Sequence, residues 1–281
     1  MSSKLKKIAV LTSVRNDRMF TKRWIEYYSR EFGANSLYMV IDGFDQERPD
    51  SATGINVISV PFKARQVVQG EKSRAARTTQ IAWGLYENYD IVIAVDIDEF
   101  VVLDPKLGLS LAEYLSGKNN VSSLSGLGLD VVQKPSEEAA ISPDAPLLNQ
   151  RNYAIISHRY TKPAVTFKRL RWGSGQHRIK GRNFRIDPNL FVFHFGNVDQ
   201  DLSAARLDDP DRQKMGWTKH QEKREELYCQ VEEAHPKDGD KTFPWARRHM
   251  SLFRPWYAWN KPGHLKKDDV VTIPDRFRDI V

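Results

Sequence analysis

The first hundred residues alternate short apolar runs with longer amphipathic ones, and this alternation limits the possible fold more than any other feature. Four runs have the length and the β-branched content of buried strands, namely residues 6–14, 36–42, 55–62 and 90–100. Strands that are separated by helices usually pair in parallel, and the helices then cover the sheet. We therefore expect an α/β fold with a Rossmann-like, mostly parallel central sheet and helices on both faces.

Two amphipathic segments connect these strands. In residues 17–33 aromatic side chains recur at helical spacing, and Gly33 follows them where a C-terminal cap is expected. In residues 71–89 the side chains that we expect to face the sheet are Ala75, Ile81, Ala82 and Leu85.

The fourth apolar run ends in three carboxylates, Asp96, Asp98 and Glu99. Alternate residues of a strand share a face, so we expect Asp96 and Asp98 to point the same way and Glu99 to point elsewhere. Two neighbouring carboxylates repel by roughly 1 to 4 kcal/mol unless a cation or a shared proton intervenes. Mg²⁺ and Mn²⁺ accept such oxygen ligands. The alternative is that these acids only cap the next helix or lie in solvent.

The sequence "DIDEF" at 96–100 resembles the Asp-x-Asp motif of the GT-A glycosyltransferases, in the variant typical of their family-2-like and family-92-like branch. Residues 13–46 are similar to the opening block of that branch: a polar loop, a Trp-bearing helix, a glycine and a strand that ends in Asp. The resemblance covers about the first 105 residues in matching order. Downstream similarity is patchier.

The resemblance implies a metal-dependent glycosyltransferase of the hexosyltransferase type. It would transfer a sugar from a nucleotide diphosphate sugar, for which we expect a UDP-sugar, to a glycan or another hydroxyl acceptor. Mn²⁺ or Mg²⁺ would be held by Asp98, with Asp96 reaching the metal or the ribose, and would stabilise the leaving diphosphate. The other residues expected near the nucleotide are Thr12, Ser13, Arg15 and Asp42, with Arg74 and Arg77 meeting phosphate or facing solvent.

The middle of the chain supplies candidates for a further metal ligand and for a general base. The resemblance makes His194 and His177 candidate third metal ligands, although both can equally be structural histidines. An inverting enzyme needs a carboxylate that accepts the proton of the acceptor hydroxyl. Asp130 is our first candidate, followed by Asp187 and the pair Glu137 and Glu138. A retaining enzyme would not need this base.

Composition divides the chain into three regions. We expect residues 1–110 to form the donor-binding half of one GT-A domain and residues 111–200 its acceptor-binding half. Residues 201–281 would form a mainly helical extension, dense in alternating charge at first. In residues 243–267 five aromatic side chains after Phe243 alternate with Arg and Lys, and three prolines argue against one continuous helix. This segment could stack on sugar rings, touch lipid headgroups as a peripheral membrane contact, or close the core.

Charge and cysteine content limit the partners and the cellular compartment that we expect. The net charge of +7 favours an anionic partner, and Cys229 is the only cysteine, so there is no disulfide framework. No signal peptide or membrane span is recognisable. We expect a bacterial cytoplasmic protein, in part at the inner face of the membrane, that acts in surface polysaccharide or lipopolysaccharide synthesis without nucleic acid.

Three other functions are compatible with parts of the sequence. A haloacid-dehalogenase-type phosphatase also uses two Asp after a strand, but its motif lies early in the chain. A nucleotide-sugar pyrophosphorylase should carry a Gly-rich loop after its first strand, where residues 12–17 contain no glycine. The third is a polysaccharide-binding or nucleic-acid-binding module without catalysis.

Overall fold

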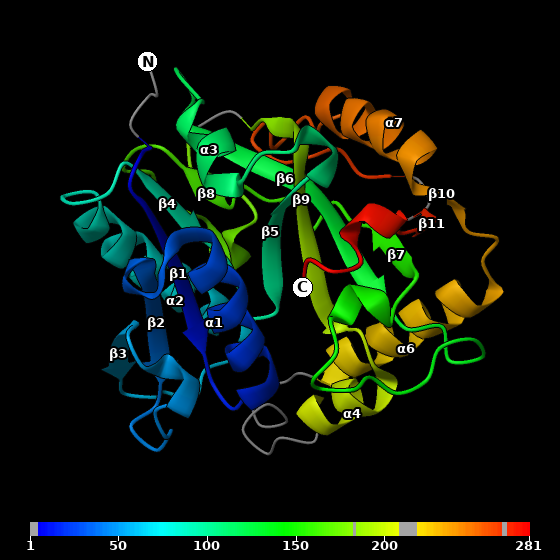
Figure 1. The fold of residues 1–281 in the computed structure, drawn as a ribbon, viewed down its shortest axis with the longest axis horizontal. Coiled ribbons are helices and arrows are strands. Elements are labelled where there is room, and N and C mark those ends of the chain that lie inside the picture. The colour runs from blue at the N-terminus through cyan, green and yellow to red at the C-terminus, as the bar shows by residue number, and fades with distance from the viewer. Residues whose placement is uncertain (1–4, 182–183, 208–217, 266–268) are drawn as a thin grey trace.

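The structure is a computed structural model that describes residues 5–181, 184–207, 218–265 and 269–281 (Figure 1). Its strands are β1 Ile8–Val14, β2 Leu37–Asp42, β3 Asn56–Val60, β4 Ile91–Ala94, β5 Glu99–Leu103, β6 Ser123–Val132, β7 Tyr153–Ile156, β8 Val165–Thr166, β9 Ile186–Asn197, β10 Lys237–Asp238 and β11 Val270–Thr272. Its α-helices are α1 Arg18–Phe32, α2 Val67–Leu85, α3 Leu111–Ser116, α4 Gln200–Leu207, α6 Thr218–Glu233 and α7 Gly239–Leu252. Short 3₁₀ helices are η1 Ala34–Ser36, η2 Asp50–Ala52, η3 Pro105–Leu107, η4 Leu147–Asn149, η5 Ser174–Gln176 and η6 Asp275–Phe277.

The strands form one mixed sheet, which confirms the α/β class. The order β10-β11-β7-β6-β8-β4-β1-β2-β3 runs across it, and β5 and β9 join through pairing of β9 with β6. Strands β3, β2, β1 and β4 are parallel. From β8 onward most pairings are antiparallel. The expectation of a mostly parallel sheet is correct for the first four strands, where α1 connects β1 to β2 and α2 connects β3 to β4, whereas the rest of the sheet is mixed.

Helices cover both faces of the parallel part, as expected. Ile8 and Val10 of β1 pack with Trp24 of α1 on one face. Ala9 and Leu11 point the other way and pack with Ala82 of α2. Successive strand residues face opposite sides, so one apolar run can serve two cores.

The first helix has the ends that its sequence predicts. The Asp17 carboxylate caps α1 by accepting a hydrogen bond from the Phe20 N–H at 3.1 Å. Gly33 ends the helix with a φ of 81°, a value that glycine adopts without strain.

The apolar run 90–100 is two strands and not the single one expected. β4 ends at Ala94 and β5 begins at Glu99, with a turn between them in which the Glu99 N–H donates to the Asp96 carbonyl at 3.1 Å. The turn is needed because β4 lies between β1 and β8, whereas β5 pairs only with β9. Asp96 and Asp98 therefore leave the sheet in a loop, where strand alternation does not decide their direction.

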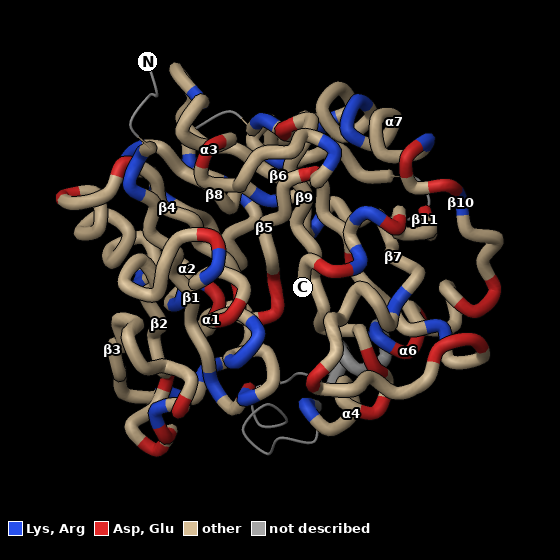
Figure 2. Tube along the Cα trace, in the orientation of Figure 1, with Lys and Arg blue, Asp and Glu red and all other residues tan. Residues whose placement is uncertain are grey.

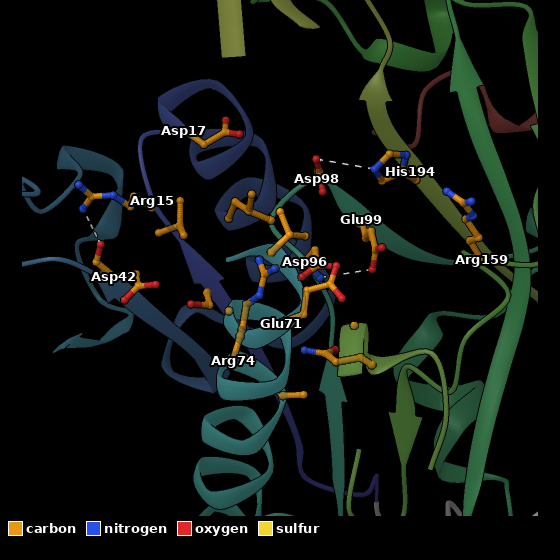
Figure 3. Close-up of a pocket in the computed structure, with 18 of the residues that line it drawn as sticks. Arg15, Asp17, Asp42, Glu71, Arg74, Asp96, Asp98, Glu99, Arg159 and His194 are labelled. Atoms are coloured by element: carbon orange, nitrogen blue, oxygen red, sulfur yellow. Dashed lines mark hydrogen bonds and ion pairs between the residues drawn. The ribbon is translucent and has the colours of Figure 1, made fainter. Parts of the chain in front are cut away.

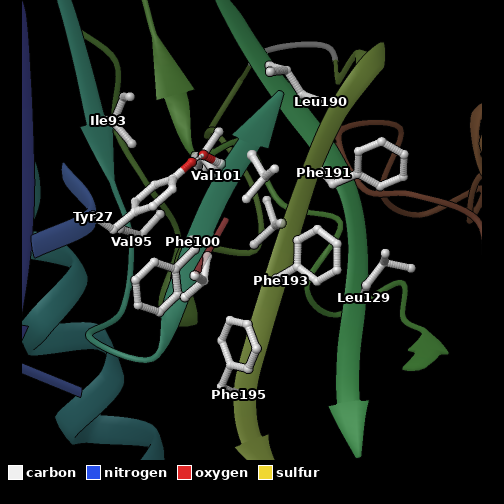
Figure 4. Packing of buried hydrophobic residues seen from close by; sticks show 14 of the residues in the cluster. Tyr27, Ile93, Val95, Phe100, Val101, Leu129, Leu190, Phe191, Phe193 and Phe195 are labelled. Atoms are coloured by element: carbon white, nitrogen blue, oxygen red, sulfur yellow. Dashed lines mark hydrogen bonds between the residues drawn. The ribbon is translucent and has the colours of Figure 1, made fainter. Parts of the chain in front are cut away.

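The core that packs against α1 extends to the place where β5, β6 and β9 meet. Phe191, Phe193 and Phe195 of β9 are fully buried, and Phe100 of β5 contacts Phe195 edge-on (Figure 4). Three consecutive odd-numbered aromatic positions share one face of the strand, as expected from their spacing. His194 therefore lies on the opposite face.

The C-terminal region is helical in part and also belongs to the sheet. Strand β11 pairs antiparallel with β7, and β10 pairs with β11. Phe243 of α7 and Phe277 of η6 both contact Phe191 in the core. Pro244 lies inside α7, so this proline does not interrupt the helix, which ends at Leu252. Within the described residues, no helix has both the length and the apolar character that a membrane crossing requires.

Candidate functional site

A cavity of about 370 Å³ opens beside the carboxyl ends of β1, β2 and β4 (Figure 3). Its size lies in the range of roughly 300–1,000 Å³ that is common for small-molecule sites. The place agrees with the rule that open α/β sheets bind ligands beyond the carboxyl ends of their strands. Eight Lys and Arg and six Asp and Glu line it, so it is rich in charge of both signs.

The first carboxylate cluster is organised by a buried lysine. Lys162 Nζ lies 2.9 Å from Asp96 Oδ2 and 2.7 Å from Glu99 Oε2, and the side chains of Lys162 and Glu99 are almost fully buried. Burial alone would raise the pKa of Asp96, but Lys162 and Arg74 outweigh it and hold that pKa below its ordinary value. Burial raises the pKa of Glu99, and Lys162 opposes this shift without cancelling it. Glu99 therefore does not point away from Asp96 as expected, since both share one cation.

The second carboxylate is paired with an arginine from the C-terminal region. Arg206 Nη2 of α4 lies 2.9 Å from Asp98 Oδ2 and 2.8 Å from Asp17 Oδ2. Burial would raise the pKa of Asp98, but Arg206 and then His194 hold it well below its ordinary range. Asp98 thus stays ionised, and it contacts a different cation from Asp96.

His194 forms a dyad with Asp130. Its Nδ1 lies 2.7 Å from Asp130 Oδ1, and its Nε2 lies 3.8 Å from Asp98 Oδ2 on the cavity side (Figure 3). The Asn197 amide donates to both Asp130 oxygens at 3.2 and 3.1 Å. The Tyr160 ring stacks on the imidazole with centroids 3.8 Å apart. Burial would lower the pKa of His194, but Asp130 and Asp98 raise it above its ordinary value.

Glycine at position 196 makes room for this imidazole. A Cβ atom there would lie 2.5 Å from His194 Cε1, which is shorter than any normal contact. The close approach of backbone and ring therefore requires a residue without a side chain.

The other end of the cavity collects the residues expected around a nucleoside. Arg77 Nη1 donates to Asp42 Oδ1 at 3.2 Å, and Arg77 Nη2 donates to Ser13 Oγ at 3.0 Å. Arg15 Nη1 donates to the Asp42 carbonyl at 2.8 Å, and its guanidinium lies 3.7 Å from the centre of the Phe62 ring. The structure thus brings four predicted residues together at the ends of β1 and β2.

Buried N–H groups without an acceptor are found on two of the arginines that line the cavity. These are Arg206 Nε, Arg206 Nη1 and Arg224 Nη1, for which no acceptor is found among the described residues. Both side chains line the cavity, from α4 and α6. Arg74 of α2 lines the same cavity. Buried donors nearly always have partners in native structures, so these groups mark a place for an anionic ligand.

The predicted metal ligands do not assemble into one metal centre. In the described ranges no group of three or more His, Cys, Asp or Glu side chains could hold a metal ion. Asp96 and Asp98 are bound to Lys162 and Arg206, and His194 Nδ1 is bound to Asp130. His177 lines the cavity, but its Nδ1 lies 3.0 Å from the Arg159 carbonyl. The donor set therefore does not fit a metal held by these four side chains.

Several other predicted residues lie outside the cavity. Asp187, a candidate base, is buried and accepts hydrogen bonds from Tyr114 and Lys118. Glu138 is buried and accepts from the Lys134 and Asn152 N–H groups. Glu137 pairs with Lys134 at the surface. The oxygens of these three residues are engaged by neighbouring groups, and none of the three residues lines the cavity.

Thr12, Arg77 and Asp130 do not line the cavity themselves. Thr12 is buried in β1, Arg77 acts through Asp42 and Ser13, and Asp130 lies behind His194. Asp130 therefore holds the His194 ring from behind and does not itself reach the cavity.

Lys162, Arg206 and Arg224 were not anticipated as site residues. Lys162 lies in a loop before β8, and the two arginines lie in a segment whose dense charge suggests solvent exposure. No local motif marks them. Lys162 and Arg206 meet the motif carboxylates only through contacts with residues 66 and 108 positions away, namely Lys162–Asp96 and Arg206–Asp98.

Comparisons with known proteins assign no family. No family model matches the chain, and no curated protein matches it. Among solved structures it is similar to glucosyl-3-phosphoglycerate synthase from Mycobacterium tuberculosis in complex with Mn²⁺, UDP-glucose and phosphoglyceric acid, at 16% identity over 44% of each chain and a TM-score of 0.29. It is also similar to a mannosyltransferase from Pyrobaculum calidifontis in complex with GDP-Man and Mn²⁺, at 14% identity over 48% of this chain and 38% of that chain and a TM-score of 0.30.

A third similar structure is mannose-1-phosphate geranyltransferase from Thermus thermophilus, at 11% identity over 80% of this chain and 65% of that chain and a TM-score of 0.30. The chain spans less than half the length of the first two structures. With scores and identities this low, function has to be argued from the residues of the cavity.

Proposed function

We propose that this protein is a glycosyltransferase of the hexosyltransferase type that uses a nucleotide diphosphate sugar, with a UDP-sugar as the expected donor, and a glycan or other hydroxyl acceptor. The observation that carries the proposal is the order of groups along one cavity. Asp42, supported by Arg77, lies at one end, guanidinium groups with unsatisfied N–H donors line the cavity, and the His194–Asp130 dyad lies beside Asp98.

This order matches the needs of sugar transfer. The bond from the anomeric carbon to the diphosphate oxygen breaks, and negative charge develops on the leaving diphosphate. Guanidinium donors that already face the cavity stabilise that charge. The acceptor oxygen forms the new bond to the anomeric carbon, and its proton passes to His194 Nε2, while Asp130 holds the opposite ring nitrogen.

The proposal predicts selective binding of nucleoside diphosphates. Calorimetric titration of UDP and of GDP into the purified protein should show binding of one base in preference to the other, because Asp42 and Ser13 lie where the nucleoside is placed. If neither nucleotide binds in the presence of Mn²⁺ or of EDTA, the transferase proposal is wrong. Salt-sensitive binding of DNA without nucleotide binding would instead favour the binding-module alternative.

The charges of the described residues do not favour nucleic acid as the partner. In Figure 2, Lys and Arg residues are interspersed with Asp and Glu residues, and in this view they do not form a single basic stripe. The anionic partner suggested by the net charge is better matched by the diphosphate of the donor, for which the cavity has donors.

We place the reaction in surface polysaccharide or lipopolysaccharide synthesis at the inner face of a bacterial membrane. The surface that contacts the membrane in this proposal is formed by Leu252, Phe253, Trp256, Tyr257 and Trp259. These side chains are exposed, with Trp256 at 85% and Trp259 at 69%. Exposed apolar clusters of this kind are uncommon on proteins without an interaction partner. The exposed Arg248 on α7 adds positive charge nearby, which suits anionic lipid headgroups.

Replacing Trp256 and Trp259 by alanine should weaken binding to anionic liposomes about tenfold or more, because burying even one large apolar side chain in the interface is worth on the order of 1.5–3 kcal/mol. Flotation with vesicles that contain anionic lipid at low salt measures this. Phe44→Ala is the matched control, since Phe44 is 72% exposed in the loop after β2. Equal flotation of all three proteins, or none for wild type, would contradict the membrane contact; retention on a glycan column instead would point to sugar stacking.

A further inference from the structure

We propose that the cavity binds the diphosphate of its nucleotide through Arg206 and Arg224 and without a divalent metal ion. The inference rests on the proposed function, and it assigns to two arginines of the C-terminal region the charge neutralisation that the Asp-x-Asp resemblance assigns to Mn²⁺ or Mg²⁺. Binding without a metal ion would differ from the metal dependence that the Asp-x-Asp motif leads us to expect.

The first argument is that the motif carboxylates already have cationic partners. Lys162 is shared by Asp96 and Glu99 at 2.9 and 2.7 Å, and Arg206 is shared by Asp17 and Asp98 at 2.8 and 2.9 Å. A metal ion at Asp98 Oδ2 would compete with Arg206 for that oxygen. Separating a buried ion pair leaves an uncompensated charge, which strongly opposes such an exchange.

Arg206 and Arg224 also have N–H donors that the ion pairs do not use. Arg206 uses only Nη2 for Asp98 and Asp17, and its Nε and Nη1 are buried with no acceptor within the described chain. Arg224 Nη1 is in the same state. The two ion pairs engage Nη2 of Arg206 and hold its guanidinium in place. They leave its Nε and Nη1 donors available to a ligand.

Guanidinium groups are also chemically suited to bind a diphosphate. Guanidinium groups present planar sets of N–H donors that match phosphate oxygens, and they remain charged at every physiological pH. Two guanidiniums from contacting helices α4 and α6 present N–H donors at the cavity, and Arg74 of α2 lines it as well, so a diphosphate would meet cationic donors here without a metal ion. Asp17 and Asp98 fix the position of Arg206 before the ligand arrives. Less side-chain conformational entropy is therefore lost when the ligand binds.

The test is calorimetric titration of UDP and GDP into the full chain, first with MnCl₂ and then with excess EDTA. Wild type should bind its preferred nucleotide with affinities that agree within about twofold in the two conditions. Arg224→Gln should weaken binding about tenfold or more in both, because a charge-assisted hydrogen bond is lost. Arg169→Gln, at an exposed arginine in the loop after β8 that does not line the cavity, is the matched control and should bind like wild type.

Arg206→Gln provides a second measurement. It should also weaken nucleotide binding, and because it frees Asp98 it should increase Mn²⁺ binding, which electron paramagnetic resonance of the free ion measures. Should Arg206→Gln fail to fold, Arg224→Gln decides alone, since no ion pair of Arg224 is found in the described part of the protein.

The outcomes distinguish the inference from the proposed function. Binding that requires Mn²⁺ and disappears in EDTA overturns the inference and leaves the transferase standing. Metal-independent binding that Arg224→Gln does not change overturns the assignment of the arginines. Failure of both nucleotides to bind in either condition overturns the proposed function and the inference with it.

Discussion

Lys162→Met should lower the free energy of unfolding by about 3–5 kcal/mol, which is the usual cost of removing one partner of a buried ion pair. The Lys162 side chain is 2% exposed and Glu99 is 1% exposed, so water cannot replace the lost charge. Methionine keeps the volume, and the loss therefore comes from the uncompensated carboxylates and not from a cavity. Urea unfolding followed by fluorescence measures the change in midpoint.

Two further variants show that the effect belongs to the buried charges. Lys106→Met removes a lysine that pairs with Asp104 at 3.0 Å but is 59% exposed, and it should cost less than about 1 kcal/mol. Glu99→Gln placed on the Lys162→Met background should recover part of the loss. A Lys162→Met protein that unfolds at the same urea concentration as Lys106→Met would show that the cluster is not held by this lysine.

His194→Asn should reduce nucleotide release from the donor sugar by about 10²–10⁴-fold, the usual contribution of a positioned general base. Asparagine can still donate to Asp130 from the place of Nδ1, but it has no basic atom at the place of Nε2. Steady-state release of nucleoside diphosphate, with water or a sugar as acceptor, measures the loss. His235→Asn, at an exposed histidine of the C-terminal region, is the control.

The dyad also predicts the pH dependence. A base must be neutral, and Asp130 and Asp98 raise the pKa of His194, so kcat/KM should rise with pH through a value above the ordinary histidine pKa of about 6.5. Asp130→Asn removes the larger of the two raising charges and should move this limb to lower pH. A profile that stays in place in Asp130→Asn would contradict the role of His194.

The amino-acid sequence predicted the parallel part of the sheet well because that part depends on local patterns. Apolar alternation in β1 places Val10 and Leu11 on opposite faces, and both faces are covered as expected. Asp42, Asp96 and Asp98 reach the cavity because each follows a strand whose carboxyl end lies at the same sheet edge. These features need only the period of a strand and the handedness of a crossover.

The partners of those acids depended on the tertiary structure. Lys162 precedes the short strand β8, and β8 pairs antiparallel with β4, which brings the lysine beside the turn that follows β4. Arg206 reaches Asp98 from α4, beyond the end of β9. Local sequence periodicity does not predict these contacts, because they depend on the order in which strands that are far apart in the sequence lie in the sheet. The sequence by itself determined the first four strands and the acids at their ends, whereas long-range packing decided that cations of the chain, and a histidine held by Asp130, would meet those acids.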